Sequence, residues 1–131
     1  MTNLKSQNYI SNSKSTDVKI RAYKFSLRII VFVNQLPNKR AFWSMSDQLL
    51  RSTTSIGANM IEAKASSSKR EFIKFYEIAL KSANETKYWI CLLRDSYPKF
   101  KSECIALLQE AEEISKMLGS SVLTLKGKKR F

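Results

Sequence analysis

The 131-residue sequence predicts an all-α fold, namely an antiparallel, up-down-up-down four-helix bundle. Apolar residues recur at spacings of three and four in four separate segments, which is the period of an amphipathic helix. Only three glycines and two prolines interrupt the chain, so a few long elements are favoured over a fold with many turns. We expect one domain, with the bundle over residues 15–126 between a polar, flexible arm at 1–14 and a basic tail at 127–131.

The first helix is expected over residues 16–36. It should begin at Ser15 or Thr16 with Asp17 in its first turn, where a carboxylate suits the positive end of the helix dipole. Pro37 ends the helix, because proline lacks the backbone N–H that a helix interior needs. The residues facing the core form one unbroken heptad stripe: Val18, Ala22, Phe25, Ile29, Phe32 and Leu36.

The second helix is expected over residues 45–65. Ser44 and Asp47 have the spacing of a capping box at its start. Gly57 lies in mid-helix at a cost of roughly 1 kcal/mol relative to alanine, which suggests that another backbone approaches closely there. The residues facing the core are Leu49, Thr53, Ile56, Met60 and Ala63.

The third helix is expected over residues 69–97, with a capping box from Ser68 to Glu71. Its apolar surface is wider than the seam that one neighbouring helix needs, so we predict that part of it is buried against another subunit. Two adjacent stripes form this surface: Phe72, Tyr76, Ala79, Ala83, Thr86, Ile90, Leu93 and Tyr97, and beside them Phe75, Ile78, Ser82, Glu85, Trp89 and Leu92.

The fourth helix is expected over residues 99–126, after Pro98, and Gly127 opens the basic tail. Its residues facing the core are Phe100, Cys104, Leu107, Ala111, Ile114, Leu118, Ser121 and Leu125. The two cysteines, Cys91 and Cys104, are too few and too far apart for a disulfide framework or a metal site, so we expect reduced thiols.

Polar residues of the second helix keep the same register as its apolar residues. A regular alternation of steps of four and three places a set of small, hydrogen-bonding side chains on one face of that helix. A solvated surface does not require this order, which indicates a helix packed closely against others with its polar groups satisfied across the contact. The set is Gln48, Ser52, Ser55, Asn59 and Glu62.

These residues carry a family resemblance over roughly residues 17–125. The order Gln48, Arg51, Ser52, Ser55, Ile56, Asn59, Glu62, Phe72, Ala79, Ser82 and Glu85 resembles the four-helix-bundle proteins encoded in intervening sequences of bacterial 23S ribosomal RNA genes. The chain departs from that pattern at Gly57, where members commonly have proline, and at Ala63, where they have glycine.

The resemblance implies a ring-shaped homopentamer. It also implies a relation to the accessory variability protein of diversity-generating retroelements, a basic pentamer that associates with a reverse transcriptase and with nucleic acid. A reverse transcriptase is therefore an expected partner by resemblance. The residues that mark the family form a structural polar motif: Arg51, Ser55, Asn59, Glu62, Ser82 and Glu85.

A pair of carboxylates, Glu62 and Glu85, raises the question of general acid–base catalysis. The sequence contains no histidine, no cluster with metal-ligand spacing and no glycine-rich phosphate loop. We therefore predict no catalytic residue, no bound metal and no cofactor. The alternative role is structural: the motif links helices or neighbouring subunits through hydrogen bonds, with Arg51 neutralising a carboxylate.

The sequence has 23 lysines and arginines against 11 acidic residues, a net charge of +12 that favours polyanionic partners, nucleic acid above all. In an up-down-up-down bundle, both termini and the connection between the second and third helices lie at one end. That end, with the first helix beside it, holds the predicted nucleic-acid-binding residues: Arg21, Lys24, Arg28, Lys64, Lys69, Arg70, Lys126, Lys128, Lys129 and Arg130.

Binding is expected through the phosphate backbone, because no aromatic-rich single-strand motif, recognition helix or zinc finger is evident. The alternative function is a scaffold or protein-interaction module whose basic surface is merely solvated. No apolar run reaches the roughly 18 residues that a membrane span needs, so no membrane association and a cytoplasmic location are expected.

Overall fold

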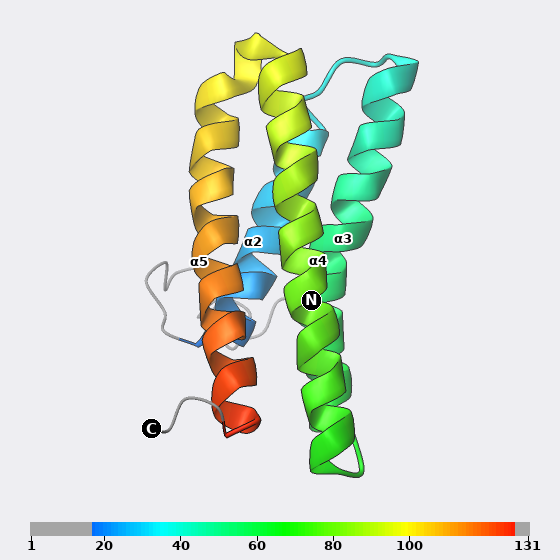
Figure 1. Cartoon of the computed structure of the whole chain (residues 1–131). Coiled ribbons are helices and arrows are strands. Elements are labelled where there is room, and N and C mark those ends of the chain that lie inside the picture. The colour runs from blue at the N-terminus through cyan, green and yellow to red at the C-terminus, as the bar shows by residue number, and fades with distance from the viewer. Residues whose placement is uncertain (1–16, 128–131) are drawn as a thin grey trace, which may run out of the picture.

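A computed structural model of the chain describes residues 17–127. Within this range, helices α2 (Val18–Val33), α3 (Arg40–Lys64), α4 (Lys69–Ser96) and α5 (Lys101–Leu125) run alternately up and down (Figure 1). A single 3₁₀ turn, η1 (Pro98–Phe100), joins α4 to α5, and the described residues form no strand. The predicted four-helix bundle is therefore confirmed. The residues expected to form an N-terminal arm, 1–14, lie outside the described range.

The helix α2 is shorter than predicted at both ends. Asp17 is its N-cap rather than a first-turn residue, and its Oδ1 accepts the Lys19 backbone N–H at 2.9 Å. At the other end the chain tightens before Pro37, where the N–H of Leu36 donates to the carbonyl of Val33 at 3.2 Å. This turn with i to i+3 hydrogen bonds occupies the last three residues of the predicted helix.

The helix α3 starts five residues earlier than predicted, at Arg40, so Ser44 and Asp47 lie inside the helix and the predicted capping box is wrong. Its N-cap residue, Lys39, makes no side-chain capping bond. Packing holds the first turn instead, because the Phe42 ring contacts the Tyr97 ring of the α4 end edge-on, with centroids 5.2 Å apart.

The capping box of α4 is confirmed. The Glu71 backbone N–H donates to Ser68 Oγ at 3.1 Å, and the Ser67 N–H donates to Glu71 Oε1 at 3.0 Å. The predicted end of α4 and start of α5 are each displaced by one or two residues, because Pro98 opens η1 rather than α5. The hairpin formed by α3 and α4 projects beyond the ends of α2 and α5 (Figure 1).

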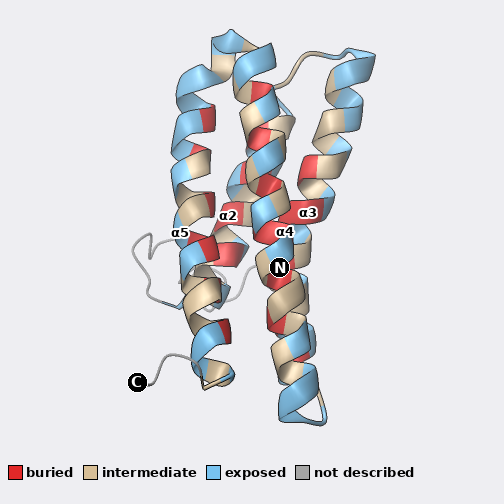
Figure 2. Cartoon of the chain, viewed as in Figure 1, coloured by how far each residue is buried: buried red, intermediate tan, exposed pale blue. Residues whose placement is uncertain are grey.

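The buried side chains line the inner faces of all four helices and form one core (Figure 2). They largely reproduce the predicted stripes, with Phe25, Ile56, Ile90 and Leu118 fully buried. In the second stripe of α4, Ser82 is buried, Leu92 is exposed, and the other residues are half-buried. The burial of this stripe against another subunit stays a prediction.

Gly57 has a different environment from the one expected. A Cβ built at this position would lie 3.9 Å from Ala22 Cβ, which is an ordinary contact, and no backbone atom lies closer. The predicted close approach of another backbone is therefore wrong within this subunit.

Two other expectations concern the described residues directly. Cys91 and Cys104 are free thiols, and burial raises the pKa of the Cys104 thiol to about 11. None of the helices between residues 17 and 127 combines the length and the apolar content that crossing a bilayer requires.

Candidate nucleic-acid interface

Three segments lie toward one end of the bundle, which we call the proximal pole: the connection between α3 and α4 (residues 65–68), the end of α5 and, set back from the hairpin tip, the start of α2 (Figure 1). An open groove of about 1070 Å³ runs between the first two turns of α4 and the residues Leu125 and Lys126 of α5. A second hollow, of about 650 Å³, brings Asp17 and Lys19 of α2 to Lys64 of α3. The predicted meeting of these segments at one end is thus present.

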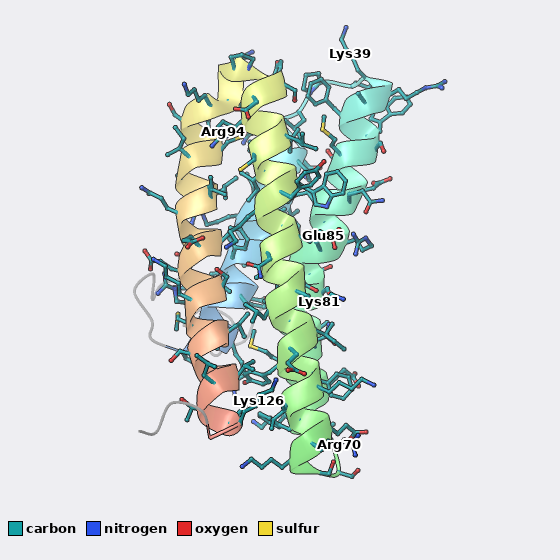
Figure 3. All side chains as sticks on the ribbon, in the orientation of Figure 1. Lys39, Arg70, Lys81, Glu85, Arg94 and Lys126 are labelled. Atoms are coloured by element: carbon teal, nitrogen blue, oxygen red, sulfur yellow. The ribbon has the colours of Figure 1, made fainter. Side chains whose placement is uncertain are left out.

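Lys64, Lys69 and Arg70 form the exposed basic part of the proximal pole. Within residues 17–127, none of the three makes an ion pair. Figure 3 shows Arg70 at the tip of the α3–α4 hairpin. The sequence analysis did not include Lys74, which is also exposed and lines the same groove. Its spacing of four from Arg70 on one helix face was the signal that it belonged to the set.

Lys126 lies at the same pole, but an acidic side chain pairs with it. The ammonium group of Lys126 forms an ion pair with Glu77 of α4, and both side chains are partly exposed. Such a surface pair contributes little to stability, but it offsets one positive charge of the pole. Lys128, Lys129 and Arg130, which the sequence analysis assigned to the same surface, lie outside the described residues.

Arg21 occupies a different environment from the predicted one. Its guanidinium donates to Glu110 of α5 at 2.6 and 2.9 Å and also contacts Glu113, and its side chain is only 15% exposed. The hydrogen bond with Glu110 is the main reason that the pKa of Arg21 is raised, although burial acts in the opposite direction. Arg21 joins α2 to α5, so we leave it out of the candidate surface.

Lys24 and Arg28 also differ from one another. The Nζ atom of Lys24 is covered and has no hydrogen-bond partner within the described chain, and burial lowers the pKa of this ammonium group. Arg28 is exposed and lines a groove of about 400 Å³ between α2 and α5, together with Glu103. The basic patch therefore does not continue along α2 as a row of three free cations.

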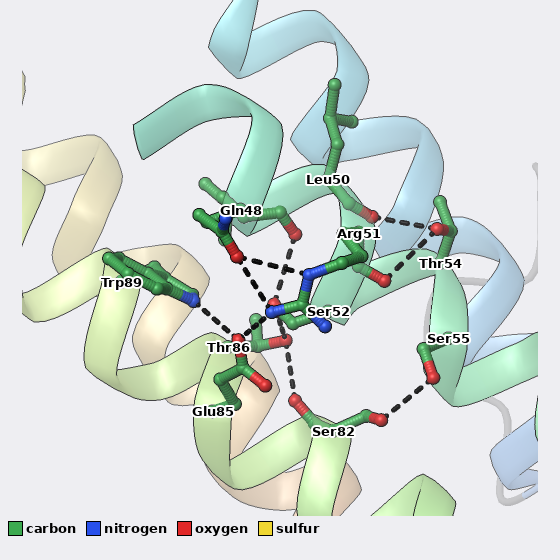
Figure 4. Close-up of polar contacts among 11 residues, drawn as sticks. Gln48, Leu50, Arg51, Ser52, Thr54, Ser55, Ser82, Glu85, Thr86 and Trp89 are labelled. Carbon is green, nitrogen blue, oxygen red and sulfur yellow. Dashed lines mark hydrogen bonds and ion pairs between the residues drawn. The ribbon is translucent and has the colours of Figure 1, made fainter. Parts of the chain in front are cut away.

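The structural polar motif lies between α3 and α4 (Figure 4). The Arg51 guanidinium forms an ion pair with Glu85 and donates to Gln48 Oε1 at 2.9 and 3.1 Å. Trp89 Nε1 donates to Glu85 Oε2 at 2.9 Å. The hydrogen bond from Trp89 is the main reason that the pKa of the Glu85 carboxyl is lowered, and the contact with Arg51 lowers this pKa further. The prediction that Arg51 neutralises a carboxylate is confirmed, and Glu85 is held ionised.

A second set of bonds continues the motif along the same contact. Ser55 Oγ of α3 lies 2.9 Å from Ser82 Oγ of α4, and Asn59 Nδ2 donates to the Ser55 carbonyl at 2.8 Å. The hydroxyls of Ser52 and Thr86 are hydrogen bonded at 2.9 Å in the buried interior. The pair of Ser52 and Thr86 was not predicted from the sequence, because Thr86 was assigned to an apolar stripe. Thr86 lies one turn after Ser82, so its position on the polar side of the helix contact was a signal for this pair.

Glu62 is the exception in the motif. It is exposed, and within residues 17–127 no hydrogen bond joins it to Glu85 or to the serines. The two glutamates therefore do not share one hydrogen-bonded site in the subunit. Clusters of three or more side chains suited to holding a metal ion are also lacking in this part of the chain.

Comparison with known proteins gives a family match and a match to a solved structure. The sequence profile described as 23S rRNA-intervening sequence protein matches residues 14–120. The fold is similar to the crystal structure of a protein with unknown function from the S23 ribosomal protein family of Bacteroides thetaiotaomicron. That similarity has a TM-score of 0.75 and 39% sequence identity, and it covers 81% of this chain and 98% of the other. No curated protein matches the sequence.

Proposed function

The chain belongs to the 23S rRNA-intervening sequence protein family, and from this premise we propose that it is a non-enzymatic, basic helical bundle that binds RNA or DNA. The proximal pole carries the binding surface, and the contacts go to the phosphate backbone. The protein acts in the cytoplasm. Sequence-independent binding follows from this mode, because phosphates are the same at every position of the nucleic acid.

The observation that carries the proposal is the grouping of Lys64, Lys69, Arg70 and Lys74 at the tip of the α3–α4 hairpin. All four are exposed and none is paired with a carboxylate within the described chain. Cations that project from one end of a bundle reach a phosphate backbone without loss of internal ion pairs. Displacement of condensed counterions then favours association.

We further propose that the bundle assembles as a homopentameric ring and serves as an accessory to a reverse transcriptase, as the likeness to the accessory variability protein of diversity-generating retroelements implies. A ring of five copies would repeat the proximal pole around one rim. The incompletely buried second stripe of α4, with Leu92 exposed at its end and Tyr88 exposed beside it, supports a contact between subunits, because monomers rarely leave such residues together in solvent.

The test is a salt series of fluorescence anisotropy with labelled RNA, single-stranded DNA and duplex DNA. We expect log affinity to fall linearly with log salt for all three probes. The double variant Lys69→Ala/Arg70→Ala should make the slope shallower by about 1.4 to 1.8, since each lost phosphate contact removes about 0.7 to 0.9.

The control is Lys116→Ala, which removes an exposed lysine from the middle of α5, where it lies 4.0 Å from Glu112. This variant should keep the wild-type slope. Absence of binding to every probe at low salt would refute the proposal, and an equal effect of both variants would refute the assignment to the proximal pole.

The second candidate function is a protein-interaction scaffold without nucleic-acid binding. The observation that favours it is the outward face of α2, where Tyr23, Ile30 and Val31 are exposed. Apolar side chains grouped on one helix face are typical of a surface that a protein covers. Under this function, a partner should remain bound after nuclease treatment and should be lost in the variant Val31→Asp.

A further inference from the structure

We propose that the end of the bundle opposite the proximal pole binds single-stranded nucleic acid by stacking a base on Trp43. We call this end the distal pole; it comprises residues 34–43 and 97–101. The inference rests on the proposed function and extends it, because it names the form of nucleic acid and a second contact surface. In this binding mode, an unstacked base packs on the tryptophan ring while the neighbouring phosphates lie near basic side chains.

Trp43 is the residue on which a base would stack. Its side chain is 56% exposed although tryptophan is among the largest apolar residues. The indole N–H donates to Asn38 Oδ1 at 2.6 Å, which holds the ring against the loop before α3. Phe42, its neighbour in sequence, packs inward on Tyr97, so α3 turns the next ring to solvent. An anchored ring with an open face loses little conformational entropy when a base stacks on it.

Exposed basic residues lie on both segments of the distal pole. Lys39 and Arg40 lie four and three residues before Trp43 and are exposed, and Figure 3 shows Lys39 projecting from this end. The first turn of α3 contains no acidic residue, so the positive end of its dipole is not compensated there. Lys99 and Lys101 lie in the other segment of the distal pole and are exposed too.

Acidic residues only partly oppose these charges. Asp95 is engaged by Arg94, whose Nε donates to it at 2.8 Å, and the pKa of Asp95 is lowered mainly by this bond. Asp47 lies one turn beyond Trp43 on the same helix. Two exposed cations, Lys39 and Arg40, therefore lie within about one helical turn of the exposed ring in sequence, and Lys99 and Lys101 add positive charge elsewhere on the distal pole. This arrangement complements a strand whose phosphates alternate with free bases.

The same arrangement selects against a duplex. Bases inside a double helix are stacked on one another, and their flat faces cannot reach a protein ring. A single strand, a loop or an end presents such faces. Stacking of one base changes affinity by a factor of about 5 to 150. A preference for single strands at the distal pole is thus separable from the phosphate binding of the proximal pole.

The experiment compares a labelled 12-nucleotide oligo(U) with a 12-base-pair duplex by anisotropy at low salt. We expect Trp43→Ala to weaken oligo(U) binding about tenfold and duplex binding less than twofold. Trp43→Phe should stay within about threefold of wild type, because it keeps an aromatic face. Tyr88→Ala is the matched control, since Tyr88 is 59% exposed but lies in α4 away from either pole. Any loss of the proposed subunit contact at Tyr88 should weaken both probes alike, so the ratio of oligo(U) to duplex affinity should stay at the wild-type value.

A second measurement keeps Trp43 in place, so its result does not depend on whether Trp43→Ala folds. In the variant Trp89→Phe, Trp43 is the sole tryptophan, and its fluorescence should be quenched by oligo(U) but not by the duplex. Unchanged oligo(U) affinity in Trp43→Ala, an equal loss for both probes, or a change in particle size by light scattering would overturn the inference. The last result would assign Trp43 to a subunit contact. Failure of wild type to bind any probe would instead refute the proposed function.

Discussion

At the scale of single residues, a cation is available to a ligand only when no carboxylate of a neighbouring helix faces it. Arg21 and Lys69 are both basic residues near the proximal pole, yet Arg21 is bound to two glutamates of α5 and Lys69 is exposed. Sequence patterns predict which residues face outward from one helix, but ion pairs between helices depend on how two helices are rotated against each other. This explains why the sequence pattern did not reveal the pairing of Arg21 with Glu110 and Glu113.

The first prediction concerns this ion-pair cluster. Arg21→Met should lower the free energy of unfolding by about 1 to 3 kcal/mol, because Glu110, whose side chain is 19% exposed, loses its arginine partner. Urea denaturation at neutral pH measures the effect. Arg28→Met is the control on the same helix and should be nearly neutral, while nucleic-acid affinity should not depend on Arg21. A large loss of that affinity in folded Arg21→Met would return the residue to the binding surface.

The second prediction concerns Glu85 and pH. Its pKa is lowered in the folded chain by the Trp89 and Arg51 bonds, so the ionised form stabilises the fold above the pKa of the unfolded chain, about 4.3. The stabilisation is lost as the pH falls through the folded pKa. Glu85→Gln should therefore be less stable than wild type at pH 7, by less than about 1 kcal/mol for so exposed a pair. The difference should shrink in urea titrations as the pH is lowered below about 4.3, and a constant difference would contradict this assignment.

At the scale of elements, local signals predicted one helix start well and another poorly. The Ser68–Glu71 box fixes the start of α4 because its hydrogen bonds lie within four residues. The start of α3 depends instead on a ring of α4 that is distant in sequence, as the Phe42–Tyr97 contact shows. The α3–α4 contact was largely predictable, because its polar residues repeat in helical register, whereas the pairing of Ser52 with Thr86 was not.

The third prediction concerns the N-cap of α4. Ser68→Ala removes the oxygen that accepts the Glu71 N–H and should cost about 1 kcal/mol. Thermal unfolding followed by circular dichroism measures the loss. Ser67→Ala is the matched control, because only the backbone N–H of Ser67 takes part in the box and that group is retained. Equal effects of the two substitutions would speak against the cap as the cause.

The fourth prediction concerns Gly57. Gly57→Ala should stabilise the isolated bundle by up to about 1 kcal/mol, since alanine favours the helix and the new Cβ meets only Ala22 at 3.9 Å. Urea denaturation measures the gain, and light scattering shows whether assembly survives. Stabilisation with loss of assembly would show that another copy packs against this glycine, whereas destabilisation at unchanged particle size would contradict the packing described here.

At the scale of the whole molecule, topology was predictable and the distribution of charge was predictable only in part. Four amphipathic segments with short connections leave an up-down-up-down bundle as the simplest arrangement, and this placed the two helix ends and the α3–α4 connection at one pole. The net charge of +12 follows from composition alone. Its location does not, since Lys126 is neutralised by Glu77 and four exposed cations lie at the distal pole.

The projecting α3–α4 hairpin has a consequence for digestion by trypsin, which cuts after lysine and arginine. Because the tip lies beyond the ends of α2 and α5, neighbouring helices shield it least (Figure 1). Within residues 17–127 we expect the earliest cut between Lys64 and Ala65, and sodium dodecyl sulfate gels should separate two fragments that co-elute under native conditions. Added RNA should delay that cut if phosphates occupy the tip. Limited digestion therefore tests both the exposure of the α3–α4 hairpin and its proposed contact with nucleic acid.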